Sequence, residues 1–157
     1  MFSNLRDCDS EELEQQMDYL SDTPVAGIVS LLRDGRCLLR KGVVSTLSNL
    51  GSLKTEFGKI GSLVPPQRSG EHKFLVSEIV PTLRANRNVP DGDLLRKIEA
   101  IMDKEAKNEI EFNVTVFSCN GESIVKDGNK RTIAFFENRR RLNNAEINYE
   151  VYLVVPR

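Results

Sequence analysis

The stretch SIVKDGNKRTIAFF, residues 123–136, decides how this chain can fold. Its first apolar pair, Ile124-Val125, is β-branched and has polar neighbours, which is typical of the end of a strand. Asp127-Gly128 predicts a tight turn, because glycine accepts backbone angles that other residues resist. Asn129 can then cap a helix formed by the apolar residues that follow it. The stretch therefore predicts a strand, a turn and a helix in direct succession.

The predicted turn has the chemistry of a phosphate site. The start of a helix directs free backbone N–H groups and the positive end of the helix dipole at one point. Lys130 and Arg131 add positive charge beside that point. The alternative is a capped helix start with two surface cations and no ligand.

Each residue of the turn has an expected role in the phosphate hypothesis. We expect Gly128 to let a triphosphate approach the backbone, and Asn129, Lys130 and Thr132 to donate hydrogen bonds to its oxygens. Arg131 is expected to clamp a phosphate or to support the turn. Asp127 is expected to hold Mg²⁺ or to cap the turn.

The composition excludes several other kinds of site. The chain has 157 residues and a net charge of −1, from 22 basic and 23 acidic residues, so it lacks the overall basic excess of most nucleic-acid-binding proteins. Three cysteines without short spacing and a single histidine leave no zinc framework and no multi-histidine centre. With no signal peptide and no apolar run near ~20 residues, we expect a cytoplasmic protein without a membrane span.

Residues 1–70 predict a mainly helical N-terminal extension and a linker. Residues 1–9 are expected to be a loose lead-in, and a helix is expected over residues 10–20, with Ser10 as its cap. Further short helices are expected between residues 22 and 60, while residues 36–44 fit a strand or a helix equally well. The proline- and glycine-rich residues 61–70 predict a linker, and we place the domain boundary there.

Residues 71–157 predict alternating strands and helices. A strand is expected over residues 73–80, followed by a basic loop in which Arg84 and Arg87 either reach the same phosphates or are simply solvated. A helix is expected over residues 91–107, a strand over residues 111–118 and a hairpin turn at residues 119–122. The helix of the turn should end near residue 141, and a last strand should cover residues 147–155.

This order of elements resembles the ParB/sulfiredoxin-like fold. The resemblance rests on the strand at residues 112–117, its hairpin partner at residues 122–126, and Asp127-Gly128-Asn129-Lys130-Arg131 in the place of a D-G-x-H/R-R motif. Ala134 and the strand at residues 149–154 also match. The resemblance implies an α+β fold with a mixed sheet flanked by helices, in which residues 71–157 bind a nucleotide and residues 1–70 form a helical extension.

The resemblance also implies an activity and its residues. It implies binding of ATP or CTP with Mg²⁺, ATPase activity, and in some members metal-dependent DNA cleavage. The residues expected to act in catalysis are Asp127, Lys130 and Arg131, with Asp127 at the metal. The residues expected to bind the nucleotide are Gly128, Asn129, Lys130, Arg131, Thr132, Arg84 and Arg87. The residues expected to contact DNA are Lys126, Arg139, Arg140 and Arg141, unless the last three only complement the helix dipole.

Differences from known members argue against two of the activities found in this family. Asn129 stands where sulfiredoxins have a catalytic cysteine, and Lys130 stands where they have a histidine, which argues against thiol-based reduction. Residues 84–88 contain no acid, which argues against the serine kinases of this fold. No DNA-reading domain is expected after the last strand. A stand-alone domain of this kind resembles the Osa-type plasmid fertility inhibitors, which interfere with conjugative DNA transfer and imply a protein partner in a DNA-transfer system.

Two alternatives remain open at this stage. One is a non-catalytic regulatory module that binds a protein partner on the same fold. The other is a degenerate Fic-like transferase, because residues 127–132 are similar to the Fic loop H-x-F-x-D/E-G-N-x-x-R. Ser123 replaces the essential histidine of that loop and Val125 replaces its phenylalanine, so the Fic alternative is the weaker of the two.

Overall fold

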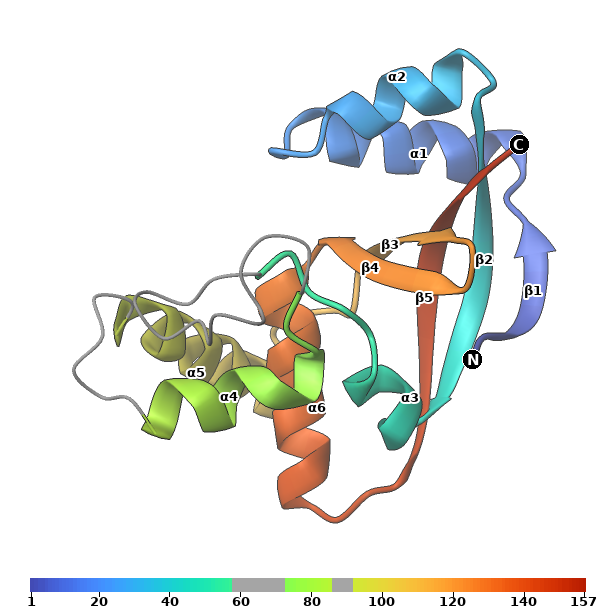
Figure 1. Cartoon of the computed structure of the whole chain (residues 1–157). Coiled ribbons are helices and arrows are strands. Elements are labelled where there is room, and N and C mark those ends of the chain that lie inside the picture. The colour runs from blue at the N-terminus through green and yellow to red at the C-terminus, as the bar shows by residue number, and fades with distance from the viewer. Residues whose placement is uncertain (58–72, 86–91) are drawn as a thin grey trace.

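The centre of the molecule is a mixed five-stranded sheet with helices on both faces (Figure 1). The computed structural model describes residues 1–57, 73–85 and 92–157. The strands lie in the order β1-β2-β5-β3-β4, where β3 and β5 are parallel and the other pairs are antiparallel. They are β1 (Ser3–Asp7), β2 (Cys37–Thr46), β3 (Thr115–Cys119), β4 (Glu122–Asp127) and β5 (Glu146–Pro156).

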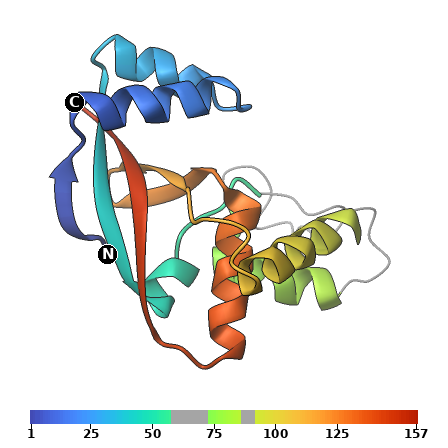
Figure 2. The ribbon, with the colours of Figure 1, turned by 180° about the vertical axis from the view of Figure 1, so that it is seen from behind.

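Helices form two groups around this sheet. The described helices are α1 (Ser10–Ser21), α2 (Gly27–Arg33), α3 (Leu47–Gly51), α4 (Val76–Ala85), α5 (Gly92–Ala106) and α6 (Asn129–Arg141). Figures 1 and 2 show α1 and α2 as a layer apart from α3, α4, α5 and α6. In the described part of the chain, no helix combines the length and apolar character that crossing a membrane requires.

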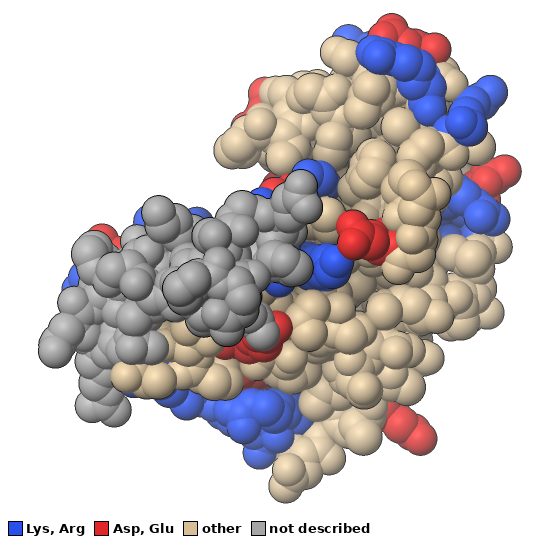
Figure 3. All heavy atoms as spheres, viewed as in Figure 1, with Lys and Arg blue, Asp and Glu red and all other residues tan. Residues whose placement is uncertain are grey.

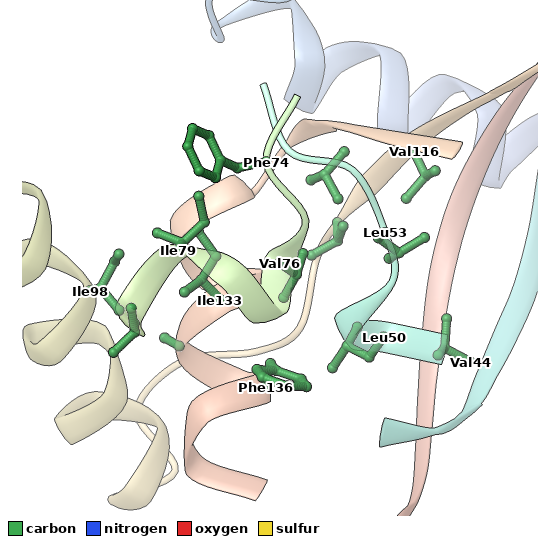
Figure 4. Close-up of a cluster of buried hydrophobic side chains, with 14 of the residues drawn as sticks. Val44, Leu50, Leu53, Phe74, Val76, Ile79, Ile98, Val116, Ile133 and Phe136 are labelled. Carbon is green, nitrogen blue, oxygen red and sulfur yellow. The ribbon is translucent and has the colours of Figure 1, made fainter. Parts of the chain in front are cut away.

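The two helix groups pack on opposite faces of the sheet. Successive side chains of a strand point to opposite faces. Accordingly, Leu153 of β5 belongs to the buried cluster under α4, α5 and α6, whereas its neighbour Val154 belongs to the cluster under α1 and α2. Figure 4 shows the larger cluster, in which Ile133 and Phe136 of α6 lie near Val76 and Ile79 of α4. Burial on both faces fixes the register of β5 and, through it, the position of α6.

Much of the second half of the chain follows the predictions. The hairpin turn is confirmed, since Asn120 and Gly121 have φ of 52° and 78° between β3 and β4. The predicted helices over residues 91–107 and 129–141 and the last strand are confirmed as α5, α6 and β5. The strand predicted over residues 111–118 begins later, at Thr115. Because a strand rather than a helix precedes Gly128, the arrangement also differs from that of a Fic loop.

The predicted strand at residues 73–80 is wrong. Most of this segment is α4, and Pro81 lies within the helix rather than ending a strand. Val76, Ile79, Val80 and Leu83 are all buried, with the spacing of a helix face. The β-branched residues suggested a strand, but packing against α6 outweighs that weak preference.

The description of residues 1–70 as mainly helical also needs correction. The expected lead-in contains β1, whose five residues are all exposed and carry no apolar alternation. Residues 37–44 of the ambiguous segment lie in β2, which pairs with β1 on one side and β5 on the other. The sheet therefore draws strands from both predicted parts of the chain, while the predicted linker at residues 61–70 lies outside the described residues. The cap of α1 is Asp9 rather than Ser10, in a capping box with Glu12.

Candidate functional site

The turn between β4 and α6 requires glycine for reasons internal to the fold. Gly128 has φ of 85° and ψ of 30°, in the left-handed region, and stands at the N-cap position in place of the predicted Asn129. A Cβ added there would lie 3.0 Å from the carbonyl oxygen of Asn113 and 3.1 Å from Cγ2 of Val114. Close packing against residues 113–114 thus explains Gly128 without any ligand.

The first turn of α6 leaves its amide groups free. No described side chain caps the helix, and its first hydrogen bond runs from the N–H of Thr132 to the carbonyl of Gly128, at 2.8 Å. The N–H groups of Asn129, Lys130 and Arg131 find no acceptor among the described residues. Free amides of this kind at a helix start are the basis of many phosphate and carboxylate sites.

Three side chains of the motif hold the turn together. Oδ1 of Asn129 accepts a hydrogen bond from the N–H of Glu56 at 3.0 Å, and its Nδ2 donates to the carbonyl of Val125 at 3.1 Å. The buried Thr132 donates to the carbonyl of Gly128 at 2.7 Å. Arg131 donates through Nη1 to the carbonyl of Asn113. These side chains therefore support the turn in this conformation, which is one of the two roles predicted for Arg131, and their contacts to phosphate stay a prediction.

Lys130 differs from the other predicted side chains. It is partly exposed and has neither a hydrogen bond nor an ion pair within residues 1–57, 73–85 and 92–157. The nearby Lys126, in contrast, pairs with Oε1 of Glu56 at 2.7 Å. Figure 3 shows basic and acidic atoms side by side in the hollow between the α1–α2 layer and the rest of the molecule. Lys130 is thus the motif cation with the most freedom to meet an anion.

Asp127, the last residue of β4, sits in a polar environment under α1. Burial raises the pKa of its carboxyl, and a hydrogen bond from Tyr19 and the charge of Arg131 partly oppose that rise. Two buried atoms here lack a hydrogen-bond partner in the described structure, Oδ2 of Asp127 and Nε of Arg131. A buried polar atom without a partner is uncommon in proteins and often marks a site that a ligand or water completes.

Residues of α1 complete this polar cluster. Gln16 is 3% exposed, and its Nε2 donates to Oγ1 of Thr115 at 3.0 Å and to Oδ1 of Asn113 at 3.3 Å. Thr115 is opposite Asp127 in the β3–β4 ladder. We did not predict Gln16 or Tyr19 as site residues. One sequence pattern could have identified Gln16. It is a polar residue on the apolar face of a helix, three residues after Leu13 and four before Leu20.

The two arginines predicted to reach the turn from the basic loop are not shown there. Arg84 is exposed in the last turn of α4 and makes no hydrogen bond or ion pair with the described residues. Arg87 lies outside the described residues. Their assignment to the nucleotide stays a prediction.

The residues predicted to contact DNA do not form one strip with the turn. Lys126 lies in β4, three residues before α6 begins, whereas Arg139, Arg140 and Arg141 lie at the end of α6, roughly 15–18 Å along the helix axis from its first residue. Arg139 pairs with the buried Glu105 at 3.0 Å and donates to the Tyr149 hydroxyl at 2.7 Å. Arg140 pairs with Glu137 at 2.7 Å. Of the three, Arg141 alone lacks such a partner in the described part of the chain.

A metal site made by the protein alone is absent from the described residues. No group of three histidine, cysteine, aspartate or glutamate side chains could hold a metal ion there. The free Oδ2 of Asp127 fits a different mode, in which Mg²⁺ takes one carboxylate from the protein and further oxygens from the phosphates of a substrate.

Comparison with protein-family models, curated proteins and solved structures finds no match for this chain.

Proposed function

We propose that the protein binds the phosphates of a nucleoside triphosphate at the start of α6. The observation that carries this proposal is the set of free N–H groups at Asn129, Lys130 and Arg131, beside the unpaired Lys130 side chain. Amides fixed by a helix bind an anion without being reordered, and a lysine beside them adds a full positive charge. The unpartnered atoms of Asp127 and Arg131 lie at the same turn and supply a second sign of an incomplete site.

The proposal gives the motif residues other roles than the sequence prediction did. Asn129, Arg131 and Thr132 tie the turn to residues 56, 113 and 128. In the proposal these residues hold the amides in place, and Lys130 with the backbone makes the contacts to phosphate. The motif is therefore a support for a backbone site rather than a set of side-chain donors.

Hydrolysis of the triphosphate is the activity that we propose for this site. A carboxyl whose pKa is raised by burial is better suited to accept a proton from water than an ordinary surface carboxylate. Asp127 would hold the attacking water and accept its proton, while the water oxygen forms a bond to the γ-phosphorus and the bond to the nucleoside diphosphate leaving group breaks. Lys130 would stabilise charge on the phosphate oxygens. As an alternative to acting as the base, Asp127 would be the protein ligand of a Mg²⁺ ion that arrives with the triphosphate and would neutralise its charge, because a carboxylate bound to a metal ion is no longer basic.

A binding and turnover experiment tests the proposal. Calorimetric titration of ATP and CTP with Mg²⁺ should show saturable binding, and Lys130→Ala should weaken it about tenfold, because a charge-assisted contact is lost. Lys97→Ala, which removes an exposed lysine from α5, is the matched control and should bind as wild type. Phosphate release should be lost in Asp127→Asn while binding persists. The proposal would be contradicted if wild type bound neither nucleotide, or if Lys130→Ala bound them as tightly as wild type does.

A second candidate is a regulatory module without catalysis. The observation in its favour is that Asn129, Arg131 and Thr132 all use their side chains within the protein. Nucleotide binding without turnover would support this candidate.

DNA cleavage and a role in blocking conjugative transfer extend the first proposal and rest on the family resemblance. The ion pairs of Lys126, Arg139 and Arg140 leave Arg141 as the free cation among the four residues assigned to DNA in the described structure. Nicking of supercoiled plasmid in the presence of Mg²⁺ tests the extension. Loss of nicking in Asp127→Asn, with no nicking by wild type in a chelator, is the expected result.

A further inference from the structure

A hollow of about 620 Å³ lies between α3, the start of α4 and the second half of α6. Its residues on α6, Phe136 and Arg140, are about 12 and 18 Å along the helix axis from Gly128. It is therefore a separate place from the turn at the start of α6. Apolar walls come from Leu47, Leu75 and Phe136.

The aromatic wall of the hollow is fixed by tight packing. Gly51 on α3 faces Phe136, and a Cβ added at Gly51 would lie 2.7 Å from Cε2 of that ring. The two helices thus meet where one has no side chain, and the Phe136 ring has little space to turn. A rigid apolar wall of this kind is typical of a preformed small-molecule site. Figure 4 shows Phe136 beside Leu50 of α3.

Arg140 is the charged residue among the described residues that line the hollow, and its guanidinium is held in place. Nε and Nη2 of Arg140 donate to the same oxygen, Oε2 of Glu137, at 3.0 and 2.7 Å. The Glu137 side chain is fully buried, so its charge requires the partner and keeps the guanidinium where it is. Nη1 of Arg140 has no partner in the described part of the chain, and 49% of the side chain is exposed. An anion can therefore approach a guanidinium that is already oriented.

The other polar groups around the hollow are neutral. Ser48 and Ser77 contribute hydroxyls that make no hydrogen bond within the described residues, and Asn143 contributes an amide. None of the described residues that line the hollow is acidic. The charge and the hydrogen-bond donors on its walls therefore match a ligand with a negative group and an apolar body.

We propose that this hollow binds a small apolar molecule that carries one anionic group, of the kind of a medium-chain or aromatic carboxylate. Its volume falls within the range of small-molecule pockets, which is roughly 300–1,000 Å³. The apolar body lies against Leu47 and Phe136, and the anionic group meets Nη1 of Arg140. The proposal is independent of nucleotide binding at the start of α6.

Fluorescence titration of the full chain tests the proposal with two kinds of probe. We expect 8-anilinonaphthalene-1-sulfonate, an aromatic sulfonate, to bind at one site per chain with a rise in fluorescence. Decanoate should displace it, and decanol, which has the same chain without the charge, should displace it about tenfold less well. Equal competition by decanol and decanoate would overturn the assignment of an anion to Arg140.

Variants locate the site. Ser77→Phe should fill the hollow and abolish binding, whereas Lys97→Gln, which changes an exposed lysine of α5 outside the hollow, should bind as wild type. Arg140→Gln alone leaves the buried Glu137 unpaired and threatens the fold, so the double variant Glu137→Gln/Arg140→Gln is the informative one. It should remain folded and bind decanoate about tenfold more weakly. Unchanged binding in Ser77→Phe and in the double variant, or no saturable binding by wild type, would overturn the proposal.

Discussion

Asp127 links the stability of the protein to its chemistry. Because burial raises the pKa of this carboxyl in the folded state, ionisation costs stability at pH values above the ordinary carboxyl range, near ~4. Below that range the carboxyl is protonated in both states and the cost disappears. Asp127→Asn should therefore be more stable than wild type at pH 7, by less than about 1 kcal/mol, since the carboxyl is only partly buried and is screened by solvent.

Urea unfolding of both proteins between pH 4 and 8 measures this difference. The difference in free energy of unfolding between Asp127→Asn and wild type should fall toward zero as the pH falls. A variant that is instead less stable at pH 7 would mean that the interactions of Asp127 with Tyr19 and Arg131 outweigh its burial.

Gly128 tests whether the turn is set by the fold itself. Gly128→Ala must adopt a left-handed φ and also place a Cβ 3.0 Å from the carbonyl oxygen of Asn113. Gly121→Ala is the matched control, because Gly121 has φ of 78° but an added Cβ there would have no atom of the described residues within 4 Å. The free energy of unfolding should fall by about 1–2 kcal/mol in the control, from the left-handed strain alone, and by more in Gly128→Ala. Equal losses in thermal or urea unfolding would show that contact with residues 113–114 does not constrain the turn.

Helix α4 shows how an element can be misjudged from sequence. Val76, Ile79 and Val80 have high strand propensity, yet their spacing places them on one buried helix face. Pro81 within α4 leaves the carbonyl of Ser77 without its helical N–H partner. Pro81→Ala should therefore raise the free energy of unfolding by about 1 kcal/mol, since the recovered hydrogen bond is partly offset by a more flexible unfolded chain.

Urea unfolding with circular dichroism checks the change at Pro81. A gain in helical signal should accompany the gain in stability. Lower stability in Pro81→Ala would indicate that α4 needs the local geometry of proline to pack against α6.

The element that carries the candidate site was predictable, while its surroundings were not. Strong local signals mark residues 119–141, namely Asn120-Gly121, Asp127-Gly128 and the apolar face of α6. The cluster of Gln16 and Tyr19 over Asp127 depends on where α1 packs, which no local pattern specifies. The edge strand β1 was missed for a related reason, because its exposed residues gain their structure from pairing with β2.

At the scale of the whole molecule, the first part of the chain is built into the same sheet as the second. β2 pairs with β5 along almost its whole length, from Cys37 opposite Pro156 to Thr46 opposite Glu146. A fragment of residues 71–157 would leave β5 without that partner and would expose Val154, which is buried under α1 and α2. We expect the fragment not to fold by itself.

Amide NMR spectra of the fragment and of the full chain test this expectation. The full chain should give dispersed resonances, and the fragment should give the narrow dispersion of an unfolded chain. A fragment with dispersed resonances matching those of the full chain would show that residues 71–157 are an independent domain.

Titration of ¹⁵N-labelled protein with ATP and Mg²⁺ tests the claim that phosphate binds the amides at the start of α6. The claim predicts that the amide resonances of Asn129, Lys130 and Arg131 shift together and saturate, with much smaller shifts in Lys130→Ala at the same ATP concentration. If these three resonances stay in place while ATP binds elsewhere or not at all, the claim is contradicted.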